Sequence, residues 1–171
     1  MAITKVHAPG TGKPKHFTQV ISMFVGGLLF ILGLCGLLFS SFAGLHISIF
    51  HGLVMASSGL ILFYNGYKNN SRHAFRACLG FSIFFGLHAL AGFLLGQPGV
   101  PEVGYAKPDP ALLKIIPNFQ ELGFSDHVLN TVISVVLMGG AIDWWRRKTK
   151  RQKRKQEKVY RRTHGQQPLH H

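Results

Sequence analysis

The chain has 171 residues, of which 47% are hydrophobic, and a formal net charge of +13. That length would suit one soluble domain, but no Asp, Glu, Lys or Arg occurs from residue 17 to residue 67. A charge-free stretch of this length is too long for one buried helix. It fits two membrane spans of about 20 residues each, joined by a tight turn.

Four hydrophobic segments are predicted to cross the membrane, at about residues 18–41, 46–66, 76–96 and 127–145. The fourth is extended by Trp144 and Trp145, because Trp favours the membrane interface. A cleaved signal peptide with a small-residue site at Ser41 and Ala43 is the competing interpretation of the first segment. That segment is longer than the apolar part of a signal peptide, which has about 7–15 residues. The predicted fold is therefore an all-α membrane protein, a four-helix transmembrane bundle at residues 17–145.

The Lys and Arg residues gather on one side of these segments. All but two of the 19 precede the first segment, join the second to the third, or follow the fourth. Lys107 and Lys114 lie on the other side. Because Lys and Arg near the ends of spans stay in the cytoplasm, both termini are predicted to be cytoplasmic (N-in/C-in).

Three segments lie outside the predicted spans. Residues 1–16 hold two prolines and two glycines and are predicted to form a disordered basic N-terminus. The outer loop, residues 97–126, holds five prolines, which exclude a long helix. Asp109 and Pro110 could still start a short interfacial helical turn, with Asp as its cap and Pro at its first position. Residues 146–171 are predicted to be a basic cytoplasmic tail.

The two halves of the chain share residues at equal spacing. The shared patterns are Gly27-x5-Gly33-Leu34 with Gly80-x5-Gly86-Leu87, and His46-x12-Gly59 with His127-x12-Gly140. They favour a duplicated helix pair, and chance similarity is the alternative because glycine is frequent in membrane helices. Since the first and third segments run the same way, the copies would be parallel repeats.

The second and fourth segments resemble the even-numbered helices of a family of uncharacterised bacterial four-helix membrane proteins built from two such helix pairs. The resemblance is carried by Asp126-His127 ahead of Gly139-Gly140, and by His46 and His51 ahead of Gly59. In that family a His follows an opening Asp or Asn after about one turn. Here Asn130 stands where a His is usual, and no acidic or amide residue precedes His51. The resemblance implies the bundle architecture for residues 20–145 and a bacterial inner membrane, and it carries no activity.

Histidine is the only ionisable residue type expected well inside the membrane, where His51, His88 and His127 map to the outer half. The structural interpretation is that His51 and His88 hydrogen-bond across helices. Candidate partners are Asn130, Ser57 and Ser82. The alternative is a binding site, with His51 and His88 as haem ligands or at a quinone, or with His127 beside them around a metal ion. No carboxylate is expected at mid-membrane to orient an imidazole, so the prediction is no cofactor.

The run of Lys and Arg after the fourth segment is predicted to bind anionic lipid, because each basic residue beside such a membrane gains about 1 kcal/mol. Its residues are Arg146, Arg147, Lys148, Lys150, Arg151, Lys153, Arg154 and Lys155. The same charge could bind an acidic protein or nucleic acid. The run has no interleaved aromatic residues for base stacking, which disfavours nucleic acid.

No catalytic motif is found, and no carboxylate is expected inside the membrane to relay protons, so neither an enzyme nor a proton-coupled transporter is predicted. The predicted function is a non-enzymatic small integral membrane protein, a structural or accessory subunit with an anionic-lipid-binding tail. The alternative is a haem-, metal- or quinone-binding bundle that uses His51 and His88. Small residues at helical spacing would allow close packing within the bundle, in a homodimer or in a larger membrane complex. These patterns are Gly52-xxx-Ala56, Ser82-xxx-Gly86 and Gly36-xxx-Ser40.

Overall fold

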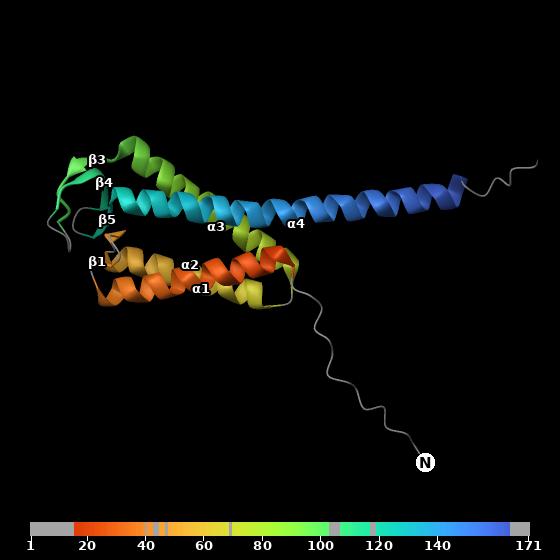
Figure 1. Ribbon diagram of the computed structural model, residues 1–171, viewed down its shortest axis with the longest axis horizontal. Helices are drawn as coiled ribbons and strands as arrows, with labels where there is room; N and C mark the ends of the chain where they lie inside the picture. The colour runs from red at the N-terminus through yellow and green to blue at the C-terminus, as the bar shows by residue number, and fades with distance from the viewer. Residues whose placement is uncertain are drawn as a thin grey trace, which may run out of the picture.

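The computed structural model describes residues 16–39, 41–42, 45–46, 48–68, 70–102, 107–116 and 119–164. The segment predicted to be disordered lies outside them, apart from His16. The helices are α1 (Phe17–Leu38), α2 (Ile49–Tyr67), α3 (Ser71–Leu95) and α4 (Phe124–His164). All four are long and apolar enough to span a membrane, which confirms the four predicted spanning helices. Figure 1 shows short strands at one end of the helices and the projecting part of α4 at the other.

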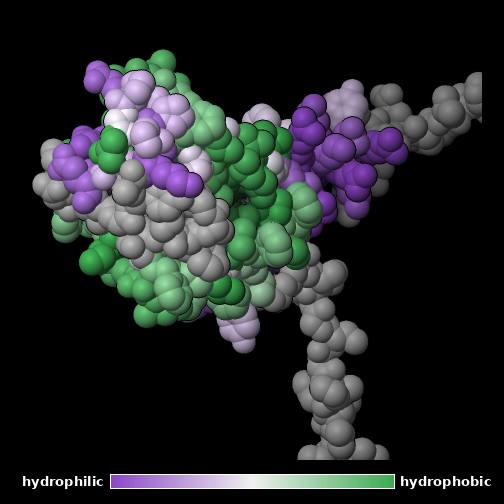
Figure 2. Space-filling view, turned by 60° about the vertical axis from the view of Figure 1, so that its left-hand side comes forward, coloured by the Kyte–Doolittle hydropathy of each residue, from purple (hydrophilic) through white to green (hydrophobic). Residues whose placement is uncertain are grey.

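The outward faces of the four helices are apolar. Between 28% and 44% of the most apolar 18-residue window of each helix is buried, so most of that hydrophobic surface faces outward. Phe24 on α1 and Leu94 on α3 are each 71% exposed. Figure 2 shows hydrophobic residues over the middle of the molecule and hydrophilic residues gathered towards its ends. Soluble proteins rarely expose apolar surface on this scale, whereas a bilayer covers it.

α1 and α2 form an antiparallel pair whose backbones touch at glycines. A β-carbon on Gly26 would lie 2.8 Å from the Gly59 carbonyl oxygen, and one on Gly33 would lie 2.7 Å from the Gly52 carbonyl oxygen. Only glycine leaves room for these approaches. Lipid supplies no hydrophobic drive for helix association, so small residues that bring backbones together stabilise the pair by close packing.

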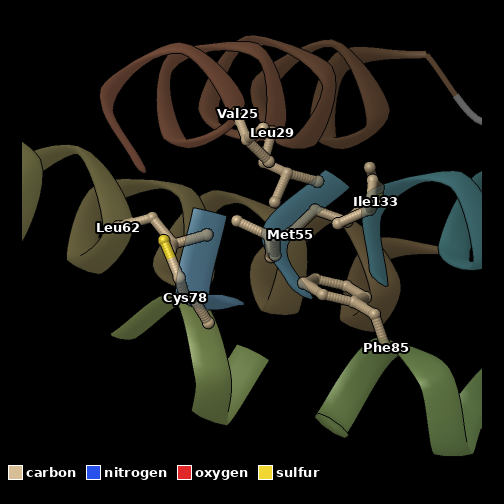
Figure 3. Close-up of a cluster of buried hydrophobic side chains, with 9 residues drawn as sticks. Val25, Leu29, Met55, Leu62, Cys78, Phe85 and Ile133 are labelled. Carbon is tan, nitrogen blue, oxygen red and sulfur yellow. The ribbon is translucent and has the colours of Figure 1, made fainter. Parts of the chain in front are cut away.

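α3 and α4 form a second antiparallel pair held by reciprocal hydrogen bonds. Ser82 Oγ donates to the Ser134 carbonyl, and Ser134 Oγ donates to the Ser82 carbonyl, each at 2.8 Å. Between the pairs lies a core drawn from all four helices (Figure 3). Its largest fully buried members include Leu29, Met55 and Phe85. The bundle therefore consists of two helix pairs, α1 with α2 and α3 with α4; the duplication stays a prediction.

The outer segment contains a small sheet that the all-α prediction did not include. Strands β3 (Gln97–Gly99), β4 (Asp109–Ile116) and β5 (Gln120–Leu122) pair antiparallel in the order β3-β4-β5. Pro98 lies on an edge strand and Pro110 near the start of β4, where a missing N–H is tolerated. A second pair, β1 (Ser41–Phe42) with β2 (Leu45–His46), lies between α1 and α2. The fold is mostly helical rather than all-α.

The predicted helical turn at Asp109 is wrong, although Asp109 does cap a helix. The Asp109 carboxylate accepts the Phe124 N–H at 3.1 Å, across 15 residues, and the Ala111 N–H at 2.9 Å. Asp126 accepts the Gly123 N–H at 2.8 Å. Two carboxylates therefore satisfy N–H groups at the start of α4, where negative charge is favoured. Pairing of β4 on both sides keeps Asp109 in a strand.

α4 continues without a break past residue 146, where the tail was predicted to begin. Its 41 residues at about 1.5 Å each are roughly twice the length that a bilayer core of about 30 Å needs. Thr18 Oγ1, near the start of α1, donates to the Gly140 carbonyl at 2.8 Å. α1 therefore begins at the end of the bundle from which the basic half of α4 projects (Figure 1).

Candidate functional site

A basic groove lies between the start of α3 and the part of α4 that leaves the bundle. It consists of a larger hollow of about 680 Å³ and an adjoining smaller hollow of about 420 Å³. Six Lys and Arg side chains line the larger hollow: Arg72, Arg76, Arg147, Lys148, Arg151 and Lys155. Among the described residues, no Asp or Glu lines either one. We call these two hollows together the basic groove.

Helical spacing places the basic side chains of the groove on facing surfaces. Arg72 and Arg76 are four residues apart on α3, and Arg147, Arg151 and Lys155 follow one another at the same spacing on α4. Residues four apart share a helix face, so each helix presents one row of positive charge. The adjacent first turn of α3 adds the partial positive charge of a helix N-terminus.

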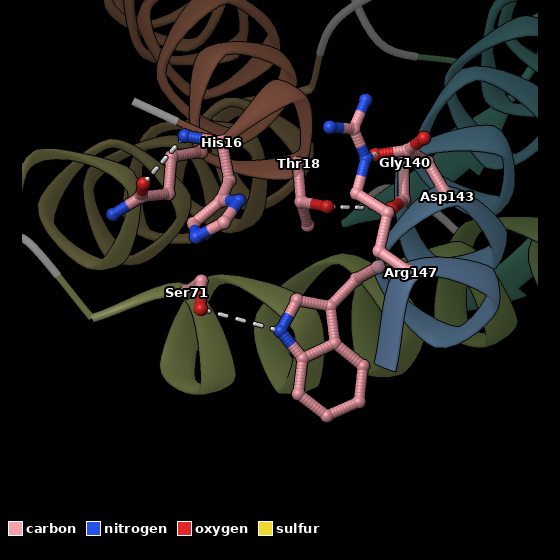
Figure 4. Close-up of polar contacts among 8 residues, drawn as sticks. His16, Thr18, Ser71, Gly140, Asp143 and Arg147 are labelled. Carbon is pink, nitrogen blue, oxygen red and sulfur yellow. Dashed lines mark hydrogen bonds and ion pairs between the residues drawn. The ribbon is translucent and has the colours of Figure 1, made fainter. Parts of the chain in front are cut away.

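An aromatic contact fixes the two walls of the groove. The rings of Phe75 and Trp144 stack with centroids 4.2 Å apart. The Trp144 indole N–H donates to Ser71 Oγ at 3.3 Å, as Figure 4 shows beside the Thr18–Gly140 bond. The Lys148 ammonium lies 5.2 Å from the Trp144 ring centre. Trp is enriched at membrane interfaces, and here it lies where α4 leaves the bundle.

Half of the residues predicted to bind lipid line the groove. Four of the eight line it, namely Arg147, Lys148, Arg151 and Lys155. The other four are exposed elsewhere on α4 and line neither hollow of the groove: Arg146, Lys150, Lys153 and Arg154. Arg147 also pairs with Asp143, one turn before it, at 2.7 Å (Figure 4).

Sequence reasoning missed the contribution of α3. Arg72, Arg76 and His73 line the groove together with His16, but the sequence marks Arg72 and Arg76 only as topology signals in a short loop. One sequence signal for this contribution was available. Arg72 and Arg76 are four residues apart and follow Asn70, a residue type that commonly caps a helix. Asn70 accepts the Arg72 N–H at 3.1 Å and starts α3 there.

The structure brings His51 and His88 together. They line one cavity of about 10 Å³ with Asn130, which is room for about one water molecule. His88 Nδ1 lies 3.0 Å from the Phe84 carbonyl oxygen of its own helix, and it donates because a carbonyl only accepts. Neither a haem nor a quinone fits a cavity of this size.

The serines predicted as partners of these histidines bond elsewhere. Ser57 is exposed and donates to the Leu53 carbonyl of its own helix at 2.8 Å. Ser82 bonds to Ser134 of α4. Asn130 is the predicted partner that shares the cavity with His51 and His88.

His127 does not line the cavity that His51 and His88 share. Its ring is fully buried, and Nε2 donates to the Ala111 carbonyl of β4 at 2.8 Å. The ring packs against Phe93, and a β-carbon on Gly92 would overlap it. Within the described part of the chain, no three His, Cys, Asp or Glu side chains are arranged to hold a metal ion. His127 joins the sheet to α4.

We expect the purified protein to be colourless, with a visible spectrum that His51→Ala and His88→Ala leave unchanged. The reason is the small size of their shared cavity. The alanine variants should instead lower thermal stability, by about 1–2 kcal/mol for the more buried His51. Absorption spectroscopy, metal analysis and thermal unfolding of the three proteins check this. A Soret band or stoichiometric metal that either variant loses would contradict it and make these histidines ligands.

Comparisons of the chain with protein-family models, curated proteins and solved structures give no match. The fold and the groove define the class: a mostly helical protein with four helices able to span a membrane and a basic surface where they end. The resemblance to a bacterial four-helix family stays a prediction.

Proposed function

We propose that this chain is a non-enzymatic integral membrane protein of a bacterial inner membrane, a structural or accessory subunit that binds anionic lipid through the basic groove. The observation that carries the proposal is the groove itself. It joins cationic rows from two helices at the level of an interfacial Trp, with no carboxylate among its described lining residues. A cytoplasmic leaflet is negatively charged and attracts basic segments beside it.

The distribution of charge at the opposite end supports the proposed orientation, with both termini in the cytoplasm. Lys114 lies on β4, where its ammonium contacts the carboxylates of Glu102 and Glu121. The hydrogen bond to Glu102 raises the pKa of Lys114, so Lys114 stays charged within an acidic cluster. Two of the 19 Lys and Arg residues lie on this side of the predicted spans, and 17 lie on the side of the groove. The side richer in Lys and Arg is the one expected in the cytoplasm.

We expect single cysteines to report this orientation in a chain whose native Cys35 and Cys78 are replaced. Cells carrying Pro108→Cys should react with a membrane-impermeant maleimide while intact. Cells carrying Gln156→Cys should react only after lysis, because that position lies on the basic half of α4. Both positions are exposed, so burial does not account for a difference. The reverse pattern would contradict the orientation with both termini in the cytoplasm.

We also expect the protein to co-purify with lipid that is richer in anionic headgroups than the membrane it came from. Replacing all eight predicted lipid-binding residues with Gln should shift the bound lipid towards bulk composition, because it removes eight of the 11 Lys and Arg residues that follow the fourth predicted span. Phospholipid analysis after purification in mild detergent measures both compositions. Raising ionic strength should weaken the enrichment through screening. An enrichment that survives the eight replacements unchanged would exclude these eight residues as its cause.

A further inference from the structure

We propose that the basic groove is a discrete site for one lipid class: an anionic lipid whose headgroup carries two phosphates, of the diphosphatidylglycerol type. This inference rests on the proposed function, since it places the groove at the headgroups of the cytoplasmic leaflet. The inference adds that one lipid binds at a defined site. General attraction between a charged helix and a charged membrane surface would need no such site.

The first argument is the convergence of charge. The larger hollow collects six cationic side chains, four of them Arg, from two helices within about 680 Å³, a volume typical of ligand sites. Arg binds phosphate through two parallel hydrogen bonds. Asp143 pairs with Arg147, and without an anion between the rows the other five cations repel one another across the groove. One phosphate would neutralise only a small part of that charge, and a two-phosphate headgroup neutralises more.

The second argument is the shape of the groove. The larger and smaller hollows share four lining residues, Arg72, Arg76, Trp144 and Lys148. Arg147, Arg151 and Lys155 line only the larger one, while Phe75 and Trp145 line only the smaller. The shared cations can therefore reach anions in both hollows at once. Two linked phosphates, one in each hollow, fit this arrangement better than one.

The third argument is the apolar side of the site, which favours a lipid over a soluble phosphate compound. Phe75, Trp144 and Trp145 form one wall of the smaller hollow. Nearer the middle of α3, the side chains of Ile83 and Leu87 are 50% and 60% exposed. Acyl chains of a lipid held at the groove would lie along such side chains. A soluble diphosphate has no group to cover them.

Two matched variants of α4 test the site. Arg151→Gln with Lys155→Gln removes one Arg and one Lys from the groove. Lys150→Gln with Arg154→Gln removes the same charge from exposed positions next to them that line neither hollow. Native mass spectrometry of delipidated full-length protein in mild detergent would measure binding of diphosphatidylglycerol, phosphatidylglycerol and soluble pyrophosphate. Circular dichroism and thermal unfolding would show that both variants keep the fold.

We expect the two-phosphate lipid to bind the native protein at least about tenfold more tightly than phosphatidylglycerol. The groove variant should lose about 30-fold in affinity for it, and the control variant should lose little. Arg76→Gln, on the facing helix, should reproduce part of the loss. Equal losses in the two variants would overturn the discrete site and leave general binding of anionic lipid by the basic half of α4. Equal binding of the two lipids, or tighter binding of pyrophosphate, would overturn the lipid class, and absence of any anionic binding would overturn the proposed function as well.

Discussion

Gly59→Ala is expected to destabilise the protein by about 2 kcal/mol, although alanine is the better helix former by about 1 kcal/mol. A β-carbon at position 59 would lie 2.7 Å from the Gly26 carbonyl oxygen of α1 and would overlap the Phe30 backbone nitrogen. Both obstacles are main chain, so no side chain can turn aside to relieve them. The helices must separate, and the close packing that holds α1 to α2 is lost along the whole pair.

Two control variants are expected to change stability in the opposite direction. A β-carbon on Gly80 or Gly139 meets no atom within 4 Å, so Gly80→Ala and Gly139→Ala should stabilise the protein by up to about 1 kcal/mol. Thermal unfolding of the three variants in one detergent compares them directly. A stabilising Gly59→Ala would contradict the backbone contact between α1 and α2.

Asp109→Ala is expected to lower the free energy of unfolding by about 2 kcal/mol, at the upper end of the range for loss of a helix cap. The Asp109 carboxylate accepts N–H groups from both Phe124 and Ala111, so its loss leaves two donors without their partner and loosens β4 from α4. Asp109→Asn keeps an acceptor oxygen and should cost about half as much. Hydrogen exchange at the Phe124 amide and thermal unfolding measure the two effects.

Asp143→Ala is the matched control for this cap. Asp143 also carries a carboxylate on α4, but its ion pair with Arg147 joins two residues one turn apart, and the Arg side chain is 55% exposed. Pairs of this kind are worth about 0.5 kcal/mol or less. Faster exchange at Phe124 in Asp143→Ala but not in Asp109→Ala would refute the assignment of Asp109 as the cap of α4.

The spans could be predicted because their signal is local. A bilayer requires about 20 apolar residues in each spanning helix, so the charge-free stretches located α1, α2 and α3 to within a few residues. The small residues at positions 52, 56, 82 and 86 were expected in helix contacts. Gly52 does face the backbone of Gly33 on α1, and Gly86 faces Ser134 on α4.

The sheet could not be predicted in the same way, because its strands are short and their pairing is not local. The link from Asp109 to the start of α4 crosses 15 residues, and the register of β4 with its two neighbours depends on the turns between them. Asp109 followed by Pro110 carries the sequence signature of a helix start. The helix that Asp109 caps begins elsewhere in the chain, and only the fold identifies it.

The candidate site also has a part that could be predicted from local sequence and a part that could not. The four helices able to span a membrane and the concentrated positive charge after the last one could be predicted, because hydrophobicity and charge are read directly from consecutive residues. Which of those charges act together depends on how the helices pack. α3 and α4 meet at Phe75 and Trp144, and that contact sets Arg72 and Arg76 opposite Arg151 in one groove. Residues more than 70 positions apart become neighbours through packing, which no local pattern contains.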